Sequence, residues 1–139
     1  MPAYDADNLF AKILRGEIPC HKIYEDGHTL AFMDIMPQAE GHALVLPKKA
    51  SRNLLDADPA IFNSLMATVQ KVARAAQRAF QSDGVLVMQF NEPGAGQTVF
   101  HLHVHVIPRK DGVALTPHSG KAADHALLAK QAERIREFI

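Results

Sequence analysis

The chain has 139 residues, a length that suits one domain with a sizeable core and no need of disulfide or metal cross-links. Its 15 lysines and arginines balance 15 aspartates and glutamates, so charge favours neither nucleic acid nor a membrane as a partner. Cys20 is the only cysteine, which excludes an internal disulfide and suits a reducing compartment. Since no secretory signal or transmembrane span is visible, we expect a cytoplasmic protein.

The first part of the chain predicts a short helix followed by a hairpin. Residues 1–7 are polar, and we expect them to be loose. Apolar residues at helical spacing predict a short helix over 9–14. Alternating residues predict strands over 21–25 and 29–33, joined by a tight turn at an Asp-Gly dipeptide.

The middle of the chain predicts two buried strands that flank a long helix. Residues 41–47 are almost continuously apolar, which is typical of a central strand covered on both faces. Asp58 and Pro59 mark a helix start, and an apolar stripe predicts one long helix through about Ser82. The apolar run at 85–90 predicts a fourth strand.

Histidines alternate with apolar residues along the stretch 97–108, which predicts a fifth strand. Because successive side chains of a strand point to opposite faces, His101, His103 and His105 share one face. A glycine-rich loop at 91–97 precedes this strand, and such loops let backbone N–H groups approach an anion. Three imidazoles on one face beside this loop indicate a site of chemistry.

The last part of the chain predicts a loop over 116–120 and a helix over 122–138. His118 and His125 match no recognised pattern, so we expect both to be surface residues.

The order and spacing of these motifs resemble the histidine triad (HIT) superfamily of nucleotide hydrolases and transferases, most of all its Hint-type branch. The family signature is His-φ-His-φ-His-φ-φ, where φ is apolar, and residues 101–107 here read HLHVHVI. The resemblance covers roughly residues 8–108. The other matching segments are 9–13, 16–19, 32–35, 37–39, 41–42, 45–48, Asn91 and 96–98.

The resemblance implies an α+β fold with one long helix packed on a five-stranded, mainly antiparallel sheet, and two further helices. Residues 1–139 would form a single HIT domain, in which 109–139 are a divergent C-terminal extension that contains a helix. HIT proteins of this type usually form homodimers, so we expect a homodimer here.

The resemblance also implies hydrolysis or transfer at the α-phosphate of a purine nucleoside 5′-phosphoramidate or a related nucleotide conjugate. His103 would attack the phosphorus as a neutral imidazole, and water would release a nucleoside monophosphate from the covalent nucleotidyl-histidine. His101 and His105 would flank the phosphate, and His42 would support His101. These four histidines are the predicted catalytic residues.

An apolar pocket would hold the base, with weak discrimination between adenine and guanine. Asp34 would accept hydrogen bonds from the ribose hydroxyls, because a carboxylate can accept from two vicinal hydroxyls at once. The predicted nucleotide contacts are Leu9, Phe10, Ile18, Phe32 and Ile35 at the base, together with Asp34, Asn91, Gly96, Gln97, Thr98, His103 and His105.

Three alternatives stay open. A dinucleoside polyphosphate hydrolase would belong to the same family. A zinc-dependent hydrolase could use the triad as metal ligands, and a nucleotide-binding scaffold would have little activity. The scheme above needs no metal or cofactor, and we expect none. Some relatives carry a structural zinc on a Cys-x-x-Cys near the N-terminus, but Asn8 and Ala11 occupy those positions here.

Overall fold

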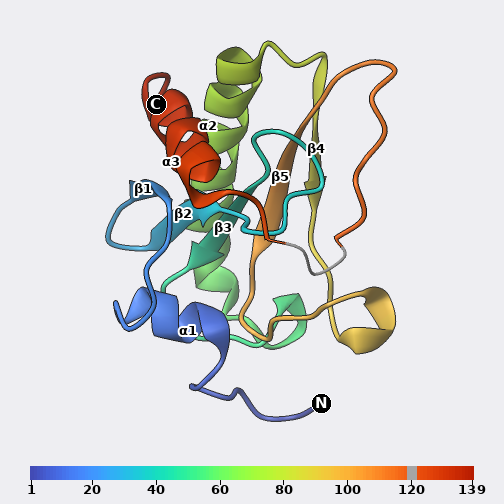
Figure 1. Cartoon of the computed structure of the whole chain (residues 1–139). Helices are drawn as coiled ribbons and strands as arrows, with labels where there is room; N and C mark the ends of the chain where they lie inside the picture. Colours follow the sequence, from blue (N-terminus) through green and yellow to red (C-terminus); the bar gives the residue numbers. More distant parts are fainter. Residues whose placement is uncertain (119–121) are drawn as a thin grey trace.

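The computed structural model describes residues 1–118 and 122–139, and it has the predicted α+β architecture (Figure 1). Five strands form one antiparallel sheet in the order β1-β2-β3-β5-β4. The strands are β1 (Lys22–Glu25), β2 (Thr29–Met33), β3 (Ala43–Pro47), β4 (Gly84–Met88) and β5 (Val104–Arg109). The α-helices in the described residues are α1 (Leu9–Leu14), α2 (Phe62–Phe80) and α3 (His125–Arg136), and short 3-10 helices lie at η1 (Leu54–Asp56), η2 (Pro59–Ile61) and η3 (Pro93–Ala95).

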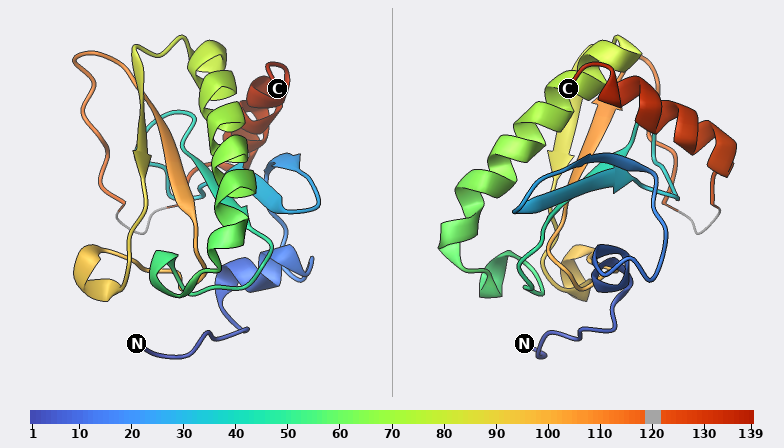
Figure 2. Two further views of the ribbon diagram at one scale, coloured as in Figure 1. Left: turned by 180° about the vertical axis from the view of Figure 1, so that it is seen from behind. Right: turned by 90° about the vertical axis from the view of Figure 1, so that its left-hand side faces the viewer.

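The long helix α2 covers one face of the sheet, and α3 lies beside it (Figure 2). Asp58 caps the preceding turn η2 by accepting a hydrogen bond from the Ala60 N–H, as the Asp-Pro pair predicts. The apolar stripe of α2 packs on the side chains that alternate along the strands, and this contact forms the larger core. No helix among the described residues has the length and apolar character to cross a membrane.

The opposite face of the sheet carries α1 and a smaller apolar cluster. Phe10 of α1 packs with Leu30 and Phe32 of β2 and with Leu44 of β3. Asn8 caps α1, because its side-chain oxygen accepts a hydrogen bond from the Ala11 N–H at 2.9 Å. This second face therefore holds α1 over the middle strands.

The strand that carries the triad is shorter than predicted. We expected a strand over 97–108, but β5 begins at Val104, so that only His105 lies within the ladder. Before Val104 the chain is held to β3 and the segment after it by other contacts. The His101 ring donates a hydrogen bond to the Pro47 carbonyl at the end of β3, and the Leu102 N–H donates to the Ser51 carbonyl. The alternation of side chains nevertheless continues back through Leu102, which is buried in the larger core.

The C-terminal extension folds back onto the rest of the chain. The helix predicted over 122–138 is observed as His125–Arg136, capped by the Asp124 side chain. Of the loop predicted over 116–120, positions 119 and 120 lie outside the described residues. Two backbone hydrogen bonds, Thr116 N–H to Gln38 and Ala123 N–H to Ile35, join the extension to the loop that follows β2.

Candidate active site

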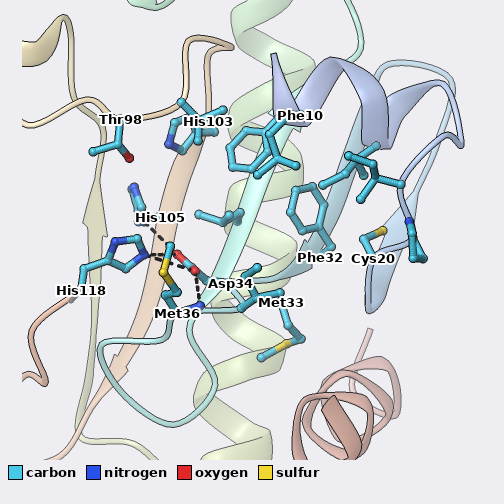
Figure 3. Close-up of a pocket in the computed structure, with 17 residues that line it drawn as sticks. Phe10, Cys20, Phe32, Met33, Asp34, Met36, Thr98, His103, His105 and His118 are labelled. Atoms are coloured by element: carbon cyan, nitrogen blue, oxygen red, sulfur yellow. Dashed lines mark hydrogen bonds and ion pairs between the residues drawn. The ribbon is translucent and has the colours of Figure 1, made fainter. Parts of the chain in front are cut away.

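A cavity of about 670 Å³, including its open mouth, lies between α1, the middle strands and the segment before β5 (Figure 3). Its walls are mostly apolar with a few polar side chains, as is typical of small-molecule sites. The predicted nucleotide contacts that line it are Leu9, Phe10, Ile18, Phe32, Asp34, Ile35, Thr98, His103 and His105. The fold thus gathers residues from the N-terminal helix, the hairpin and the triad at one place.

Aromatic rings connect the apolar part of the cavity to the triad. The Phe10 ring meets Phe32 edge to face, with centroids 5.5 Å apart, and meets His103 in the same way at 4.8 Å. Leu9 and Ile35 are 39% and 40% exposed at the mouth. Apolar side chains that stay exposed around a cavity suit a flat apolar ligand that would cover them.

Within the described part of the chain, His103 has one ring nitrogen in a hydrogen bond and the other without a partner. Its Nδ1 lies 2.6 Å from the carbonyl oxygen of His101, so Nδ1 carries the proton and Nε2 keeps its lone pair. Burial lowers the pKa of His103, although the same carbonyl bond works in the opposite direction. His103 is therefore a neutral imidazole at neutral pH, with Nε2 available as a nucleophile.

His42 and His105 form a hydrogen-bonded pair with fixed tautomers. The Gln38 N–H donates to His42 Nδ1 at 3.0 Å, which puts the proton of His42 on Nε2. His42 Nε2 then donates to His105 Nδ1 at 2.9 Å, which leaves the proton of His105 on Nε2. Burial lowers the pKa of His42 to about 4 and that of His105 to about 3, so both rings are neutral at pH 7.

The prediction that His42 supports His101 is wrong. Leu44 pairs with His105 across the β3–β5 ladder. His42, two residues before Leu44, lies on the same face and diagonal to His105, within reach of its ring.

His101 is fully buried and does not line the cavity. Its Nε2–H donates to the Pro47 carbonyl at 2.8 Å, and the Tyr4 hydroxyl donates to its Nδ1 at 2.6 Å. Burial lowers the pKa of His101 to about 4. Of the triad, the structure therefore brings His103 and His105 to the cavity. The His101 ring instead joins β3 to Tyr4, which lies in the segment 1–7 that we expected to be loose. A catalytic role for His101 stays a prediction.

Asp34 is buried at the end of β2 and has a partner that we did not predict. The Met36 N–H donates to Oδ1 at 2.8 Å, and His118 Nε2 lies 3.1 Å from Oδ2 and 3.3 Å from Oδ1 (Figure 3). The expectation that His118 is a surface residue is wrong, because its side chain lines the cavity. No local pattern could indicate this contact, since 84 positions separate the two residues.

Asn91, Gly96 and Gln97 do not line the cavity. The buried Gln97 amide donates to the carbonyls of Arg52 and Val99, and its oxygen accepts from Glu92 N–H. These bonds tie the glycine-rich loop to the segment after β3. Asn91 does the same through Leu54 N–H, which donates to its Oδ1. Their predicted contact with phosphate stays a prediction. We did not predict the ion pair between Arg52 and Glu92, which braces this loop at 2.6 Å.

The ligand atoms of Asp34, His42 and His105 all lie within 4.8 Å of one another, a spacing that a metal ion could use. Their hydrogen bonds oppose this use. A metal on His42 Nε2 would require the proton on Nδ1, where the Gln38 N–H already donates. The three side chains are therefore arranged for hydrogen bonding. At the N-terminus, Asn8 is the cap of α1 and offers no thiolate.

Comparison with known proteins finds a family and named relatives that this chain resembles. A family model described as "HIT domain" matches residues 15–112. A protein of Arabidopsis thaliana named adenylylsulfatase HINT3 is 34% identical over 129 residues, which are 93% of this chain and 66% of that protein. A protein of Saccharomyces cerevisiae named adenosine 5′-monophosphoramidase HNT1 is 38% identical over 107 residues, which are 77% of this chain and 65% of that protein.

Solved structures resemble the whole fold. The crystal structure of a Hit-like protein from Bartonella henselae has a TM-score of 0.95 and 50% identity, and it covers 99% of this chain and 100% of its own. A zinc-bound histidine triad family protein from Mycobacterium smegmatis has a TM-score of 0.82 and 32% identity, with 94% and 91% covered.

The fold, the triad and these matches define the class: the chain belongs to the HIT family. Within that family it is of Hint type, and its general kind is that of a HIT-family nucleotide hydrolase.

Proposed function

We propose that the chain hydrolyses purine nucleoside 5′-phosphoramidates, or related nucleotide conjugates, at the α-phosphate and releases a nucleoside monophosphate. One observation carries the proposal: the proton of the neutral His103 is held on Nδ1 by the His101 carbonyl, so that Nε2 keeps its lone pair at the wall of a mostly apolar cavity. An imidazole in this state is a nucleophile without any need of a separate base.

In the first step Nε2 of His103 attacks the α-phosphorus. A P–N bond to His103 forms, the P–N bond to the leaving amine breaks, and the amine takes that electron pair and a proton from solvent. His105 presents its Nε2–H to a phosphoryl oxygen, because its Nδ1 accepts from His42. Thr98 also lines the cavity, and its hydroxyl is the second donor for the phosphate or the leaving group.

In the second step water attacks the same phosphorus. The P–N bond to His103 breaks, its electron pair returns to Nε2, and the proton lost by water passes to solvent. The nucleoside monophosphate leaves, and His103 is again neutral. Two moderate displacements thus replace one difficult displacement, and neither needs a metal ion.

The names of the two relatives support a site that recognises the nucleotide part of the substrate and accepts different leaving groups. A monophosphoramidase expels an amine and an adenylylsulfatase expels sulfate, but both reactions break a bond at the phosphate of an adenylyl group. A chain of this kind therefore recognises the nucleoside and the α-phosphate. In this chain the apolar residues around Phe10 would hold the base and Asp34 would hold the ribose.

The test compares release of AMP from adenosine 5′-phosphoramidate, adenylyl sulfate and a diadenosine polyphosphate, with EDTA present. The proposal predicts turnover of the phosphoramidate or the sulfate in preference to the dinucleotide. Preference for the dinucleotide would favour the dinucleoside polyphosphate hydrolase. Turnover that stops with EDTA would favour a zinc enzyme. AMP binding without any turnover would favour a scaffold.

We also propose a homodimer that forms through the sheet. Among the described residues β4 pairs only with β5, so its outer edge offers free backbone groups, and Val87 on it is 44% exposed. Light scattering after size exclusion would show twice the chain mass. A single domain over residues 1–139 and a cytoplasmic location likewise stay predictions.

A further inference from the structure

The C-terminal extension supplies a side chain to the ribose end of the cavity. His118 lines the cavity, and its Nε2 lies within hydrogen-bond distance of both carboxylate oxygens of Asp34 (Figure 3). Backbone hydrogen bonds from Thr116 and Ala123 join the extension to the loop after β2 on both sides of His118. His118 is therefore held at this place by the fold.

The Asp34 carboxylate needs such a donor. The residue is only 5% exposed, and a buried carboxylate is costly unless hydrogen bonds satisfy it. His42 Nε2 is 3.4 Å from Oδ2, but its proton points to His105, which is closer at 2.9 Å. Among the residues that the structure describes, the His118 Nε2–H is thus the side-chain donor committed to Asp34.

The carboxylate keeps acceptor capacity beyond these partners. An ionised carboxylate has about four lone-pair positions. The Met36 N–H uses one position on Oδ1, and the His118 N–H is shared between the two oxygens. With respect to residues 1–118 and 122–139, positions therefore remain for two vicinal hydroxyls, and the donors already in place set the direction of these positions.

We propose that His118 is a positioning residue for ribose recognition, which holds the Asp34 carboxylate in the orientation that accepts hydrogen bonds from the 2′- and 3′-hydroxyls. This inference rests on the proposed function, because it takes Asp34 as the ribose acceptor. It gives the C-terminal extension a role in the choice of ribonucleotides over nucleotides that lack these hydroxyls.

Calorimetric titration with AMP and with 2′,3′-dideoxy-AMP tests the inference without any need of turnover. The wild type should prefer AMP. His118→Ala should weaken AMP binding by about fivefold to tenfold, since it removes one hydrogen bond to a charged group that water partly replaces. The same variant should leave dideoxy-AMP binding within about twofold, because no hydroxyl meets Asp34 in that ligand.

Two variants serve as controls. His118→Gln should keep most of the preference for AMP, because its amide can donate near the position of Nε2. His28→Ala changes an exposed histidine in the β1–β2 turn and should leave both affinities unchanged.

Equal weakening of both nucleotides by His118→Ala would indicate a merely structural role and overturn the inference. Tighter AMP binding would show that His118 competes with ribose, which would also overturn it. Asp34→Asn separates the inference from the proposed function. If Asp34→Asn removes the preference for AMP and His118→Ala does not, only the role of His118 falls. If Asp34→Asn keeps the preference, the ribose role of Asp34 falls and the inference with it.

Discussion

The Nε2 atom of His42 lies 2.9 Å from the Nδ1 atom of His105, and both side chains are buried. Because the Gln38 N–H occupies the other nitrogen of His42, the proton between the two rings belongs to His42. His105 must then carry its own proton on Nε2. A backbone amide at one end of this chain of hydrogen bonds thus decides which nitrogen of a triad histidine can donate to the phosphate.

His42→Ala tests this relay. Without the His42 donor, the proton of His105 can move to Nδ1, and the N–H that would face the phosphate is lost. We expect kcat for AMP release to fall by about tenfold to a hundredfold with little change in KM. His28→Ala is the matched control, because it removes an exposed histidine outside the cavity. An unchanged kcat in His42→Ala would contradict the relay.

The buried histidines predict a loss of stability in mild acid. The pKa values of His42 and His101 fall to about 4 and that of His105 to about 3, against an ordinary value of 6.5. Below pH 6.5 these rings therefore take up protons in the unfolded chain but not in the folded one. Each should remove about 1.4 kcal/mol from the free energy of unfolding per pH unit, until the pH reaches the folded pKa.

Urea unfolding at pH 7, 6 and 5 measures this effect. The window above pH 5 isolates the histidines, because carboxylates with lowered pKa values, such as Glu25 at about 2, lose their contribution only in stronger acid. A free energy of unfolding that stays constant or rises between pH 7 and pH 5 would show that these rings are not held neutral by burial.

Gly41 is the position where the entry to β3 tolerates no side chain. Its φ is +83°, and an added Cβ would lie 2.6 Å from two atoms of the Phe80 ring. Gly41→Ala should therefore lower the free energy of unfolding by about 2–4 kcal/mol. Gly27→Ala is the control, since no atom lies within 4 Å of the added Cβ and its φ is not positive. Equal stability of the two variants in urea unfolding would refute this account of the turn before His42.

Tyr4 and His101 are joined by a 2.6 Å hydrogen bond across 97 positions of the chain. Tyr4→Phe keeps the ring but leaves the buried Nδ1 without a donor, so the free energy of unfolding should fall by about 1–2 kcal/mol. Because the His101 ring does not line the cavity, kcat should stay within about twofold of the wild type. A large loss of kcat at unchanged stability would instead place His101 in the chemistry.

Local features of the sequence suffice for most of the fold. The hairpin strand predicted over 29–33 is observed as Thr29–Met33, and the Asp58-Pro59 pair caps the turn that leads into α2. Periodicity and capping act over a few residues, so they can be recognised without the fold. The start of β5 could not be predicted in this way. Apolar residues and histidines alternate in the same way before Val104 as within β5, so the pattern does not mark where strand pairing begins.

The site residues could be predicted from the sequence only where they belong to a motif of the family. Most of the cavity residues from Leu9 to His105 lie in segments that match the family pattern, and the exceptions are Cys20, Met36, Leu44 and Val99. The partners of those residues come from elsewhere: Tyr4 reaches His101, and His118 reaches Asp34. Each contact joins segments that are distant in sequence. The local sequence around a tyrosine or histidine in a polar stretch does not indicate which residue its side chain will contact. The fold is needed to reveal them.

Release of AMP from adenosine 5′-phosphoramidate by the wild type and by His103→Ala, both with EDTA, is the most direct test of the central claim. The account predicts that wild-type turnover survives chelation. It also predicts that His103→Ala loses at least about a thousandfold in kcat, because the nucleophile is gone. His103→Ala activity within about tenfold of the wild type would contradict a covalent role for His103. Wild-type turnover abolished by EDTA would contradict a mechanism without metal.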